Sequence, residues 1–254
     1  MLKVDMKIYA SVLLCVFLLL ISSPGSAREY LAVSMEFAPF SYTENGTVKG
    51  LDSEIVEECF RRMGEDVELI LIPWNRALSM GMQGNADCIF NILKTPEREF
   101  QLLYSKPLRQ EIMTLYVRKD SPLEFNGDLS ELKGLRLGLI RDFSYGKKVD
   151  IFIKNQVPDS DIEFSVASEM SVAKLIKGRF EVMVGDMIST LGAINRLGVA
   201  DQVRQLGAPI SKNDVYVAFS KKRNLRYLRD RFNVALESMR VDGTLDRIVK
   251  KYIE

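Results

Sequence analysis

The feature of the sequence that most constrains its fold is a regular alternation of short apolar segments with amphipathic segments. The apolar segments, which are typical of strands, are "EYLAVSM" (29–35), "VELILIPW" (67–74) and "ADCIFNIL" (86–93). Between them lie "LDSEIVEECFRRMG" (51–64) and "RALSMGMQG" (76–84), in which apolar residues recur at helical spacing. Strands and helices that alternate in this order predict a parallel sheet covered by helices.

A second series of the same kind begins at "LKGLRLGLI" (132–140). It continues with helical segments near 145–155 and at "EMSVAKLIKGRF" (169–180), and it reaches a strand at "FEVMVGD" (180–186). A second sheet covered by helices is therefore expected after the first.

Two β-rich runs, 112–120 and 214–222, lie before and after most of the second series, and two helical segments, 226–240 and 243–253, close the chain. This order predicts an α/β fold of two lobes joined by two extended crossings, with the final helices on the first lobe. A single continuous α/β domain is the alternative, which periodicity alone leaves open. The predicted organisation is a signal peptide (1–27), the first lobe (28–115), the second lobe (116–216) and the first lobe again (217–254).

The first 27 residues differ in character from the rest. Lys3 and Lys7 precede the apolar run 8–21, and the small residues Gly25 and Ala27 follow a helix-breaking stretch. This pattern is typical of a secretory signal cut after Ala27, which predicts a periplasmic mature chain. An uncleaved anchor is the alternative, but the apolar run is shorter than the roughly 20 residues that span a bilayer.

Composition removes several classes of function. The chain has no histidine, so sites with histidine ligands and nucleophilic triads with histidine are excluded. The whole chain carries a formal charge of +1, and the signal segment removes +1 through Lys3, Asp5 and Lys7, which leaves zero. No basic patch favours nucleic acid. Cys59 and Cys88 remain in apolar positions, where buried free thiols are expected and a disulfide is the alternative.

The segment "NILKTPEREF" (91–100) places an unusual cation. If Thr95 caps a helix and Pro96 is its first residue, Arg98 lies in the first turn, where the helix dipole favours anions. Arg98 is therefore either paired with an anion, or it is an ordinary solvated arginine beside Glu97 and Glu99.

Several motifs taken in order give the chain a wider resemblance. They are "APFSYTENGTVKGLDSEIVEECFRRMG", "PWNRALSMGMQGNAD", "KTPERE", "LKGLRLGLI", "GRFEVMVGD" and "LESMRVDGTLDRIVKKYI". Over nearly the whole mature chain this set resembles the periplasmic solute-binding proteins of amino-acid ABC importers, the polar-amino-acid class called family 3. The resemblance implies two lobes that close over a small solute.

Carried over residue by residue, the resemblance assigns Arg98 to the α-carboxylate of the ligand and Asp186, on the other lobe, to its α-ammonium. A planar guanidinium suits a carboxylate because it donates two parallel hydrogen bonds. Phe37 and Trp74 match aromatic positions that flank the ligand, and Ser144 matches a donor to the carboxylate. From the residues alone, a helix cap is the alternative interpretation of Asp186, and Phe37 and Trp74 are alternatively core residues.

The chain also departs from the family pattern. Leu93 stands where the family has a hydroxyl that accepts from the ammonium, so Asn91 or main-chain carbonyls are expected to replace it. The usual Gly-Thr-Thr loop of the second lobe reads Asp142, Phe143 and Ser144, which indicates a reshaped pocket. It would suit a ligand with a second acidic group if Arg141 or Arg76 points inward. The expected ligand-binding set is Arg98, Asp186, Trp74, Phe37, Ser144, Asn91, Arg141, Tyr145 and Arg76.

The resulting hypothesis is a monomeric receptor without catalysis, cofactor or metal, which captures an amino acid or similar carboxylate-bearing solute and presents it to a membrane permease. An enzyme on the same scaffold, similar to a dehydratase of cyclic pre-aromatic acids, is one alternative. It is disfavoured because no second carboxylate is evident beside Asp186. A sensor that reports to a membrane receptor is the other alternative.

Overall fold

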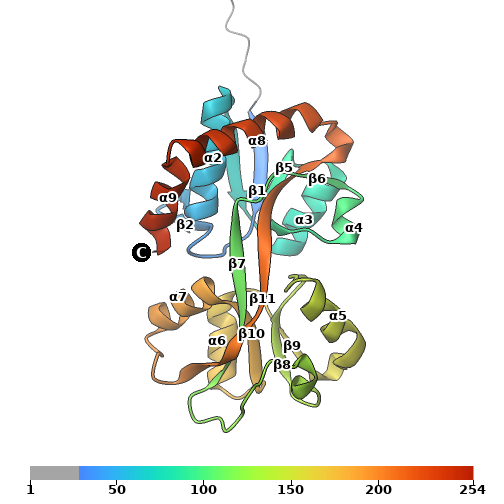
Figure 1. Cartoon of the computed structure of the whole chain (residues 1–254), viewed down its shortest axis with the longest axis vertical. Coiled ribbons are helices and arrows are strands. Elements are labelled where there is room, and N and C mark those ends of the chain that lie inside the picture. Colours follow the sequence, from blue (N-terminus) through green and yellow to red (C-terminus); the bar gives the residue numbers. More distant parts are fainter. Residues whose placement is uncertain (1–28, 254) are drawn as a thin grey trace, which may run out of the picture.

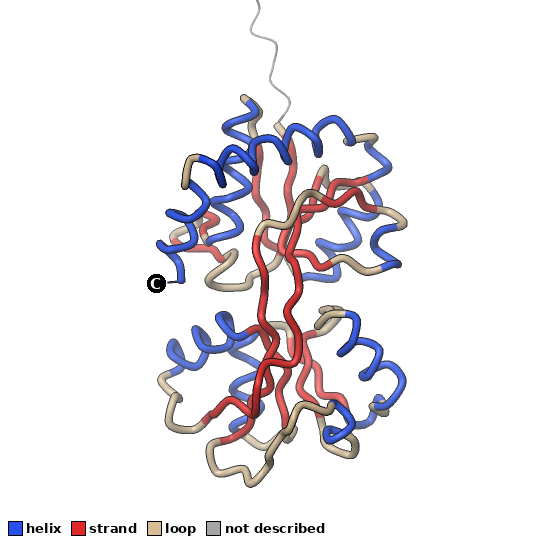
Figure 2. The backbone as a smooth tube through the Cα atoms, in the orientation of Figure 1, coloured by secondary structure: helices blue, strands red, loops and turns tan. Residues whose placement is uncertain are grey.

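The computed structural model describes residues 29–253, and the predicted signal segment lies outside them. Two lobes lie one above the other and are joined by a pair of long strands (Figure 1). Each lobe consists of strands flanked by helices (Figure 2). The predicted α/β architecture of two lobes with two crossings is confirmed.

The first lobe is built on three parallel strands in the order β4, β1, β5. Its register places Val33 of β1 opposite Ile70 of β4 and opposite Ile89 of β5. Its elements are β1 (Tyr30–Ser34), β2 (Tyr42–Glu44), β3 (Thr47–Lys49), α2 (Leu51–Met63), β4 (Val67–Leu71), α3 (Trp74–Gln83), β5 (Cys88–Leu93), α4 (Pro96–Glu99), β6 (Leu102–Tyr104), η3 (Lys221–Arg223), α8 (Arg226–Val241) and α9 (Thr244–Ile253).

The second lobe has its own three neighbouring strands in the order β10, β8, β9, and these are parallel as well. Leu137 of β8 pairs with Val182 of β10 on one side and with Ile162 of β9 on the other. Its elements are η1 (Leu129–Leu132), β8 (Leu137–Ile140), α5 (Lys147–Gln156), η2 (Asp159–Asp161), β9 (Ile162–Ser165), α6 (Ser168–Ile176), β10 (Val182–Asp186) and α7 (Met187–Leu197).

Strands β7 (Arg109–Arg118) and β11 (Val203–Ser220) form the antiparallel ribbon that crosses between the lobes (Figure 1). β11 pairs with β5 of the first lobe, whereas β7 pairs with β10 of the second. A register shift interrupts the ribbon between Leu206 and Ser211. The chain therefore passes from one lobe to the other within continuous strands and not in loops. The predicted domain limits at 115 and 216 fall inside these strands and remain a prediction.

Each lobe has its own hydrophobic core, although Ile140 at the end of β8 in the second lobe belongs to the cluster of the first. In the first lobe, buried side chains such as Ile55, Phe90 and Phe232 form one cluster. In the second lobe, Val184 of β10 belongs to a cluster on one face of the sheet and Met183 to a cluster on the other, because successive strand residues point to opposite faces. Separate cores allow each lobe to behave as a rigid unit.

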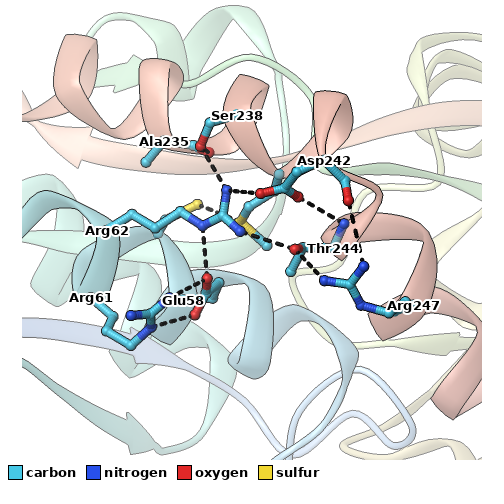
Figure 3. A network of polar contacts seen from close by, with 10 residues as sticks. Glu58, Arg61, Arg62, Ala235, Ser238, Asp242, Thr244 and Arg247 are labelled. Atoms are coloured by element: carbon cyan, nitrogen blue, oxygen red, sulfur yellow. Dashed lines mark hydrogen bonds and ion pairs between the residues drawn. The ribbon is translucent and has the colours of Figure 1, made fainter.

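Helices α8 and α9 are tied to α2 of the first lobe through Arg62 (Figure 3). Its Nε donates to Glu58 Oε1 of α2 at 2.7 Å, and its Nη1 forms an ion pair with Asp242 Oδ2, between α8 and α9, at 2.7 Å. Its Nη2 donates to Thr244 Oγ1, the first residue of α9, at 2.9 Å. The Arg62 guanidinium thus holds the C-terminal helices α8 and α9 against α2.

The start of α2 differs from the usual capping pattern. The N-cap is Gly50, with φ 121°, and no side chain caps the helix. A Cβ at Gly50 would lie 2.4 Å from the carbonyl oxygen of Phe40, so only glycine fits there. Asp52, a favoured residue type for a cap, is instead fully buried one residue inside the helix.

Both cysteines of the described part are free and buried, as expected. Cys59 lies on α2 and Cys88 begins β5. Burial raises the pKa of both thiols, so neither is ionised at neutral pH.

Candidate ligand cleft between the lobes

The carboxyl ends of the parallel strands of both lobes meet at the crossing, which is where open α/β sheets bind ligands. A pocket of about 490 Å³ lies between the lobes at this level. Glu36, Trp74 and Asn75 line it from the first lobe, and Arg141, Asp142 and Val166 line it from the second. Apolar walls with a few polar groups are typical of small-molecule sites.

Arg98 lies at this junction and is only 8% exposed, which excludes an ordinary solvated arginine. Thr95 caps α4 as expected, because its Oγ1 accepts from the Arg98 N–H at 3.3 Å. The guanidinium donates from Nη1 to the carbonyl of Leu93 at 3.1 Å and from Nη2 to the carbonyl of Asp142, in the second lobe, at 3.2 Å. With only four residues, α4 contributes little dipole, so these acceptors, and not the helix end, determine the setting of Arg98.

Four aromatic rings surround the same place. Phe37 and Trp74 belong to the hydrophobic core of the first lobe, in agreement with the alternative interpretation of them as core residues. Both also contact Phe143 of the second lobe. The Phe143 ring centroid lies 5.6 Å from that of Phe37, 6.5 Å from that of Trp74 and 5.5 Å from that of Tyr145. These separations are those of attractive aromatic pairs. The rings therefore join the two lobes across the cleft.

Asp186 combines a structural contact with an unused one. Its Oδ1 accepts from the Ser189 N–H at 2.8 Å and so caps α7, whereas its Oδ2 is buried without a hydrogen-bond partner among residues 29–253. Burial raises the pKa of Asp186, whereas the charge of Arg109 and the nearby backbone N–H groups of Ser189, Ile112 and Ile188 oppose the shift. A buried acceptor without a donor is the arrangement expected where a ligand supplies the donor.

Ser144 and Tyr145 build the loop of the second lobe. Ser144 Oγ donates to Asp150 Oδ2 at 2.5 Å, and the Tyr145 N–H donates to Asp150 Oδ1 at 2.7 Å. The Tyr145 hydroxyl accepts from the Ile140 N–H at 2.6 Å. The polar groups of both residues are used within their own lobe, so their predicted contact with a ligand remains untested.

The two arginines proposed for a second acidic group differ in position. Arg141 lines the pocket, and its guanidinium carbon lies 4.6 Å above the ring of Phe164. Arg76 is exposed near the start of α3 and is not part of the pocket wall. Only Arg141 is therefore placed beside the cleft.

Asn91 is committed to a network that the sequence did not reveal. Arg109, the first residue of β7, donates to Asp52 through Nε and Nη2 at 2.9 Å each, and Nη2 also donates to Asn91 Oδ1 at 2.8 Å. The Asn91 amide nitrogen donates to Ser41 Oγ at 3.0 Å. The Asn91 side chain thus supports Arg109, and the expectation that Asn91 or main-chain carbonyls accept from the ammonium stays a prediction.

Glu111, two residues after Arg109 on β7, is a second buried carboxylate besides Asp186 that the sequence pattern does not indicate. It is 3% exposed, and its Oε1 accepts from the Asn213 amide at 3.3 Å. Burial raises the pKa of Glu111 to about 8; Arg109 opposes the shift, and the charges of Asp186 and Asp52 add to it. The only sign of this site in the sequence is a pair of charges, Arg109 and Glu111, directly before the β-rich run 112–120.

The raised pKa of Glu111 predicts a loss of stability as pH rises. In the unfolded chain the carboxyl ionises near its ordinary pKa of 4.5, whereas in the folded chain it stays protonated up to about pH 8. Unfolding therefore releases a proton between these values, and stability falls by on the order of 1 kcal/mol per pH unit. Urea unfolding from pH 5 to 8 is expected to show a smaller fall in Glu111→Gln, while Glu124→Gln, at an exposed site, keeps the wild-type slope. Equal slopes in all three proteins would contradict the assignment.

Comparison with known proteins agrees with this arrangement. The model of the bacterial extracellular solute-binding proteins, family 3, matches residues 30–254. The probable amino-acid-binding protein YxeM of Bacillus subtilis is 26% identical over 84% of this chain and 79% of its own. The histidine-binding periplasmic protein of Salmonella typhimurium is 23% identical over 86% and 84% of the two chains.

Solved structures show the same fold. A histidine kinase sensor domain similar to periplasmic binding proteins superposes with a TM-score of 0.79 at 19% identity, over 89% of this chain and 95% of that one. The arginine-, lysine-, histidine-binding protein ArtJ of Geobacillus stearothermophilus does so with 0.76 at 19%, over 89% and 94%. Within residues 29–253, no helix has the length and apolar character needed to cross a membrane.

The family model covers nearly all of the described residues, and the sequence motifs and the two-lobe fold agree with it. The chain belongs to the family 3 bacterial extracellular solute-binding proteins.

Proposed function

We propose that this chain captures an amino acid, or a similar small solute with a carboxylate, between its lobes and delivers it to the permease of an ABC importer. The observation that carries the proposal is the presence of two buried ionisable side chains of opposite type, one on each lobe. Arg98 lies on the first lobe at the cleft, and Asp186, with an unused Oδ2, lies on the second. A zwitterion supplies an acceptor to one and a donor to the other.

The lobes explain how binding is transmitted. A ligand that touches both lobes stabilises the closed arrangement by its differential contacts, and a permease can read that arrangement. The relatives support transport, since they include a putative amino-acid ABC transporter-binding protein of Vibrio harveyi, and an arginine-binding extracellular protein of Bacillus subtilis supports an amino acid as the ligand. We place the mature chain outside the cytoplasm, as a monomer that acts without cofactor or metal.

A thermal-shift screen of the mature chain against the common L-amino acids, small peptides and dicarboxylates tests the proposal. A ligand at a hundred times its dissociation constant adds roughly 2.7 kcal/mol of stability, and we expect at least one amino acid to raise the melting temperature accordingly. A screen in which neither an amino acid nor any other carboxylate-bearing solute shifts the transition would contradict the proposal. Uptake of the labelled solute by cells with and without the chain then separates import from sensing.

One observation favours a second candidate. Glu111 and Asp186 are both buried carboxyls with raised pKa values, and the charge of Asp186 contributes to the raised pKa of Glu111. Such a pair is suited to proton transfer, and a precursor of cyclohexadienyl dehydratase has the same fold, with a TM-score of 0.72 at 20% identity. Incubation with prephenate or arogenate decides the matter, because turnover lost in Glu111→Gln would identify an enzyme.

A further inference from the structure

The loop between β8 and α5 reaches out of the second lobe and into the cleft. Its base is fixed within its own lobe, since the Arg141 N–H donates to the carbonyl of Ser165 at 3.0 Å and Asp150 accepts from Ser144 and Tyr145. The carbonyl of Tyr145 also accepts from Ser211 Oγ, on β11, at 2.8 Å. The two residues between these anchors, Asp142 and Phe143, form the tip.

The backbone of the tip contacts the first lobe. The Asp142 carbonyl accepts from Arg98 Nη2 at 3.2 Å and from Trp74 Nε1 at 2.9 Å. These two donors belong to the residues expected to hold a ligand's carboxylate and to flank the ligand. A carbonyl oxygen of the protein therefore lies where a carboxylate oxygen of the ligand would be placed.

The side chain of the tip fills the space next to it. The Phe143 ring contacts Phe37 and Trp74 of the first lobe as well as Tyr145 of its own. It is the residue that packs against the hydrophobic clusters of both lobes. Among the described residues, Phe143 thus joins the two cores.

The tip holds this position with an uncommon backbone. Asp142 has φ 59°, in the left-handed region that residues other than glycine seldom adopt, although aspartate tolerates it better than most. The bonds to Arg98 and Trp74 use only the Asp142 carbonyl, so they depend on this conformation and not on the carboxylate. A residue type that disfavours the left-handed region should release the tip.

We propose that Asp142 and Phe143 occupy the ligand seat of this protein, and that Phe143 determines which solutes bind because they must displace its ring. The proposal rests on the proposed function for the identity of Arg98 as the carboxylate anchor. The ligand's carboxylate competes for Arg98 Nη2 with a neutral carbonyl, which is the weaker acceptor for a guanidinium. The measured affinity then equals the intrinsic affinity multiplied by the fraction of molecules in which the tip is displaced.

The position of the tip can be measured without a ligand, since Trp74 is the one tryptophan of the chain. In Phe143→Ser we expect the Trp74 emission to shift to the red and its quenching by acrylamide to increase relative to wild type. Phe100→Ser is the matched control, because Phe100 is 86% exposed, and it should leave both unchanged. Equal emission and quenching in Phe143→Ser and wild type would overturn the proposal.

A second pair of variants separates the effect of the Asp142 backbone conformation from the effect of its carboxylate. Asp142→Gly and Asp142→Val both remove the carboxylate, but only glycine retains the left-handed conformation at little cost. We expect increased quenching of Trp74 in Asp142→Val and wild-type quenching in Asp142→Gly. Identical behaviour of the two would show that the seated conformation is not what shields Trp74, and circular dichroism melts confirm that both variants fold.

Calorimetry with L-arginine, L-histidine and L-glutamine then tests the effect on specificity. Three ring contacts are lost in Phe143→Ser, so we expect binding about tenfold tighter or more, or binding of an amino acid that wild type rejects. Weaker binding of every probe would show that Phe143 is a wall of the bound state and would overturn the proposal. If no probe binds any variant and the wider thermal-shift screen also finds no ligand, the proposed function fails, while the Trp74 comparison still decides whether the tip is seated.

Discussion

Replacement of Arg109 by methionine is expected to lower the free energy of unfolding by about 3–5 kcal/mol. Arg109 and Asp52 form an ion pair at 2.9 Å whose side chains are 7% and 0% exposed. The variant leaves Asp52 buried without its partner, and burial already raises the pKa of that carboxyl. Urea unfolding at pH 7 measures the loss, with circular dichroism as the signal.

The same strand supplies a matched control. Arg118, at the other end of β7, pairs with Asp120 at 3.2 Å, but the two side chains are 43% and 76% exposed. An exposed pair contributes about 0–1 kcal/mol, so Arg118→Met should change stability little. A similar small loss in Arg109→Met would contradict the role assigned to the buried pair.

A double-mutant cycle separates the ion pair from the other contacts of Arg109. The guanidinium also lies 3.5 Å above the ring of Phe40 and contacts Asn91, and methionine retains only part of that packing. If the uncompensated charge dominates, Arg109→Met combined with Asp52→Asn will be more stable than Arg109→Met alone. Additive losses would show that packing, and not charge, accounts for the effect.

The fold followed from the sequence because its signals are local. A strand such as β5 is apolar on both faces, and the helix α2 ends at Gly64, whose left-handed φ of 70° is typical of a C-cap. Such patterns depend on neighbours a few residues away, so periodicity was sufficient to order the elements of both lobes. The crossing strands were less well delimited, since β7 and β11 continue from one lobe into the other.

The candidate site was only partly predictable, and the contacts that were missed are long-range. Asp52 has the residue type of a helix cap, and nothing near it in the sequence indicates that Arg109, 57 residues later, is its partner. Glu111 likewise obtains its raised pKa from burial between elements that meet only in the folded chain. By contrast, the capping of α4 by Thr95 is local, which is why the position of Arg98 could be inferred.

Replacement of Arg98 by alanine is expected to weaken binding of the amino acid identified by the screen by several kcal/mol, which is more than a hundredfold. Arg98 is 8% exposed, so the variant would leave the ligand's carboxylate unpaired in a desolvated cleft. Isothermal titration calorimetry measures the loss. Arg98→Lys retains the charge but not the planar fork, so an intermediate affinity is expected.

Arg98 also donates to the Asp142 carbonyl, so Arg98→Ala has two opposing effects on the affinity for the ligand. Loss of the carboxylate contact weakens binding, whereas loss of the contact with the loop frees the seat and strengthens it. The bond between the guanidinium and a carboxylate is stronger than the bond between the guanidinium and a neutral carbonyl, so the net result is weaker binding. In an Asp142→Val background the loop no longer competes, and Arg98→Ala should then weaken binding by an even larger factor. Unchanged or tighter binding in both backgrounds would show that Arg98 serves the loop and not the ligand.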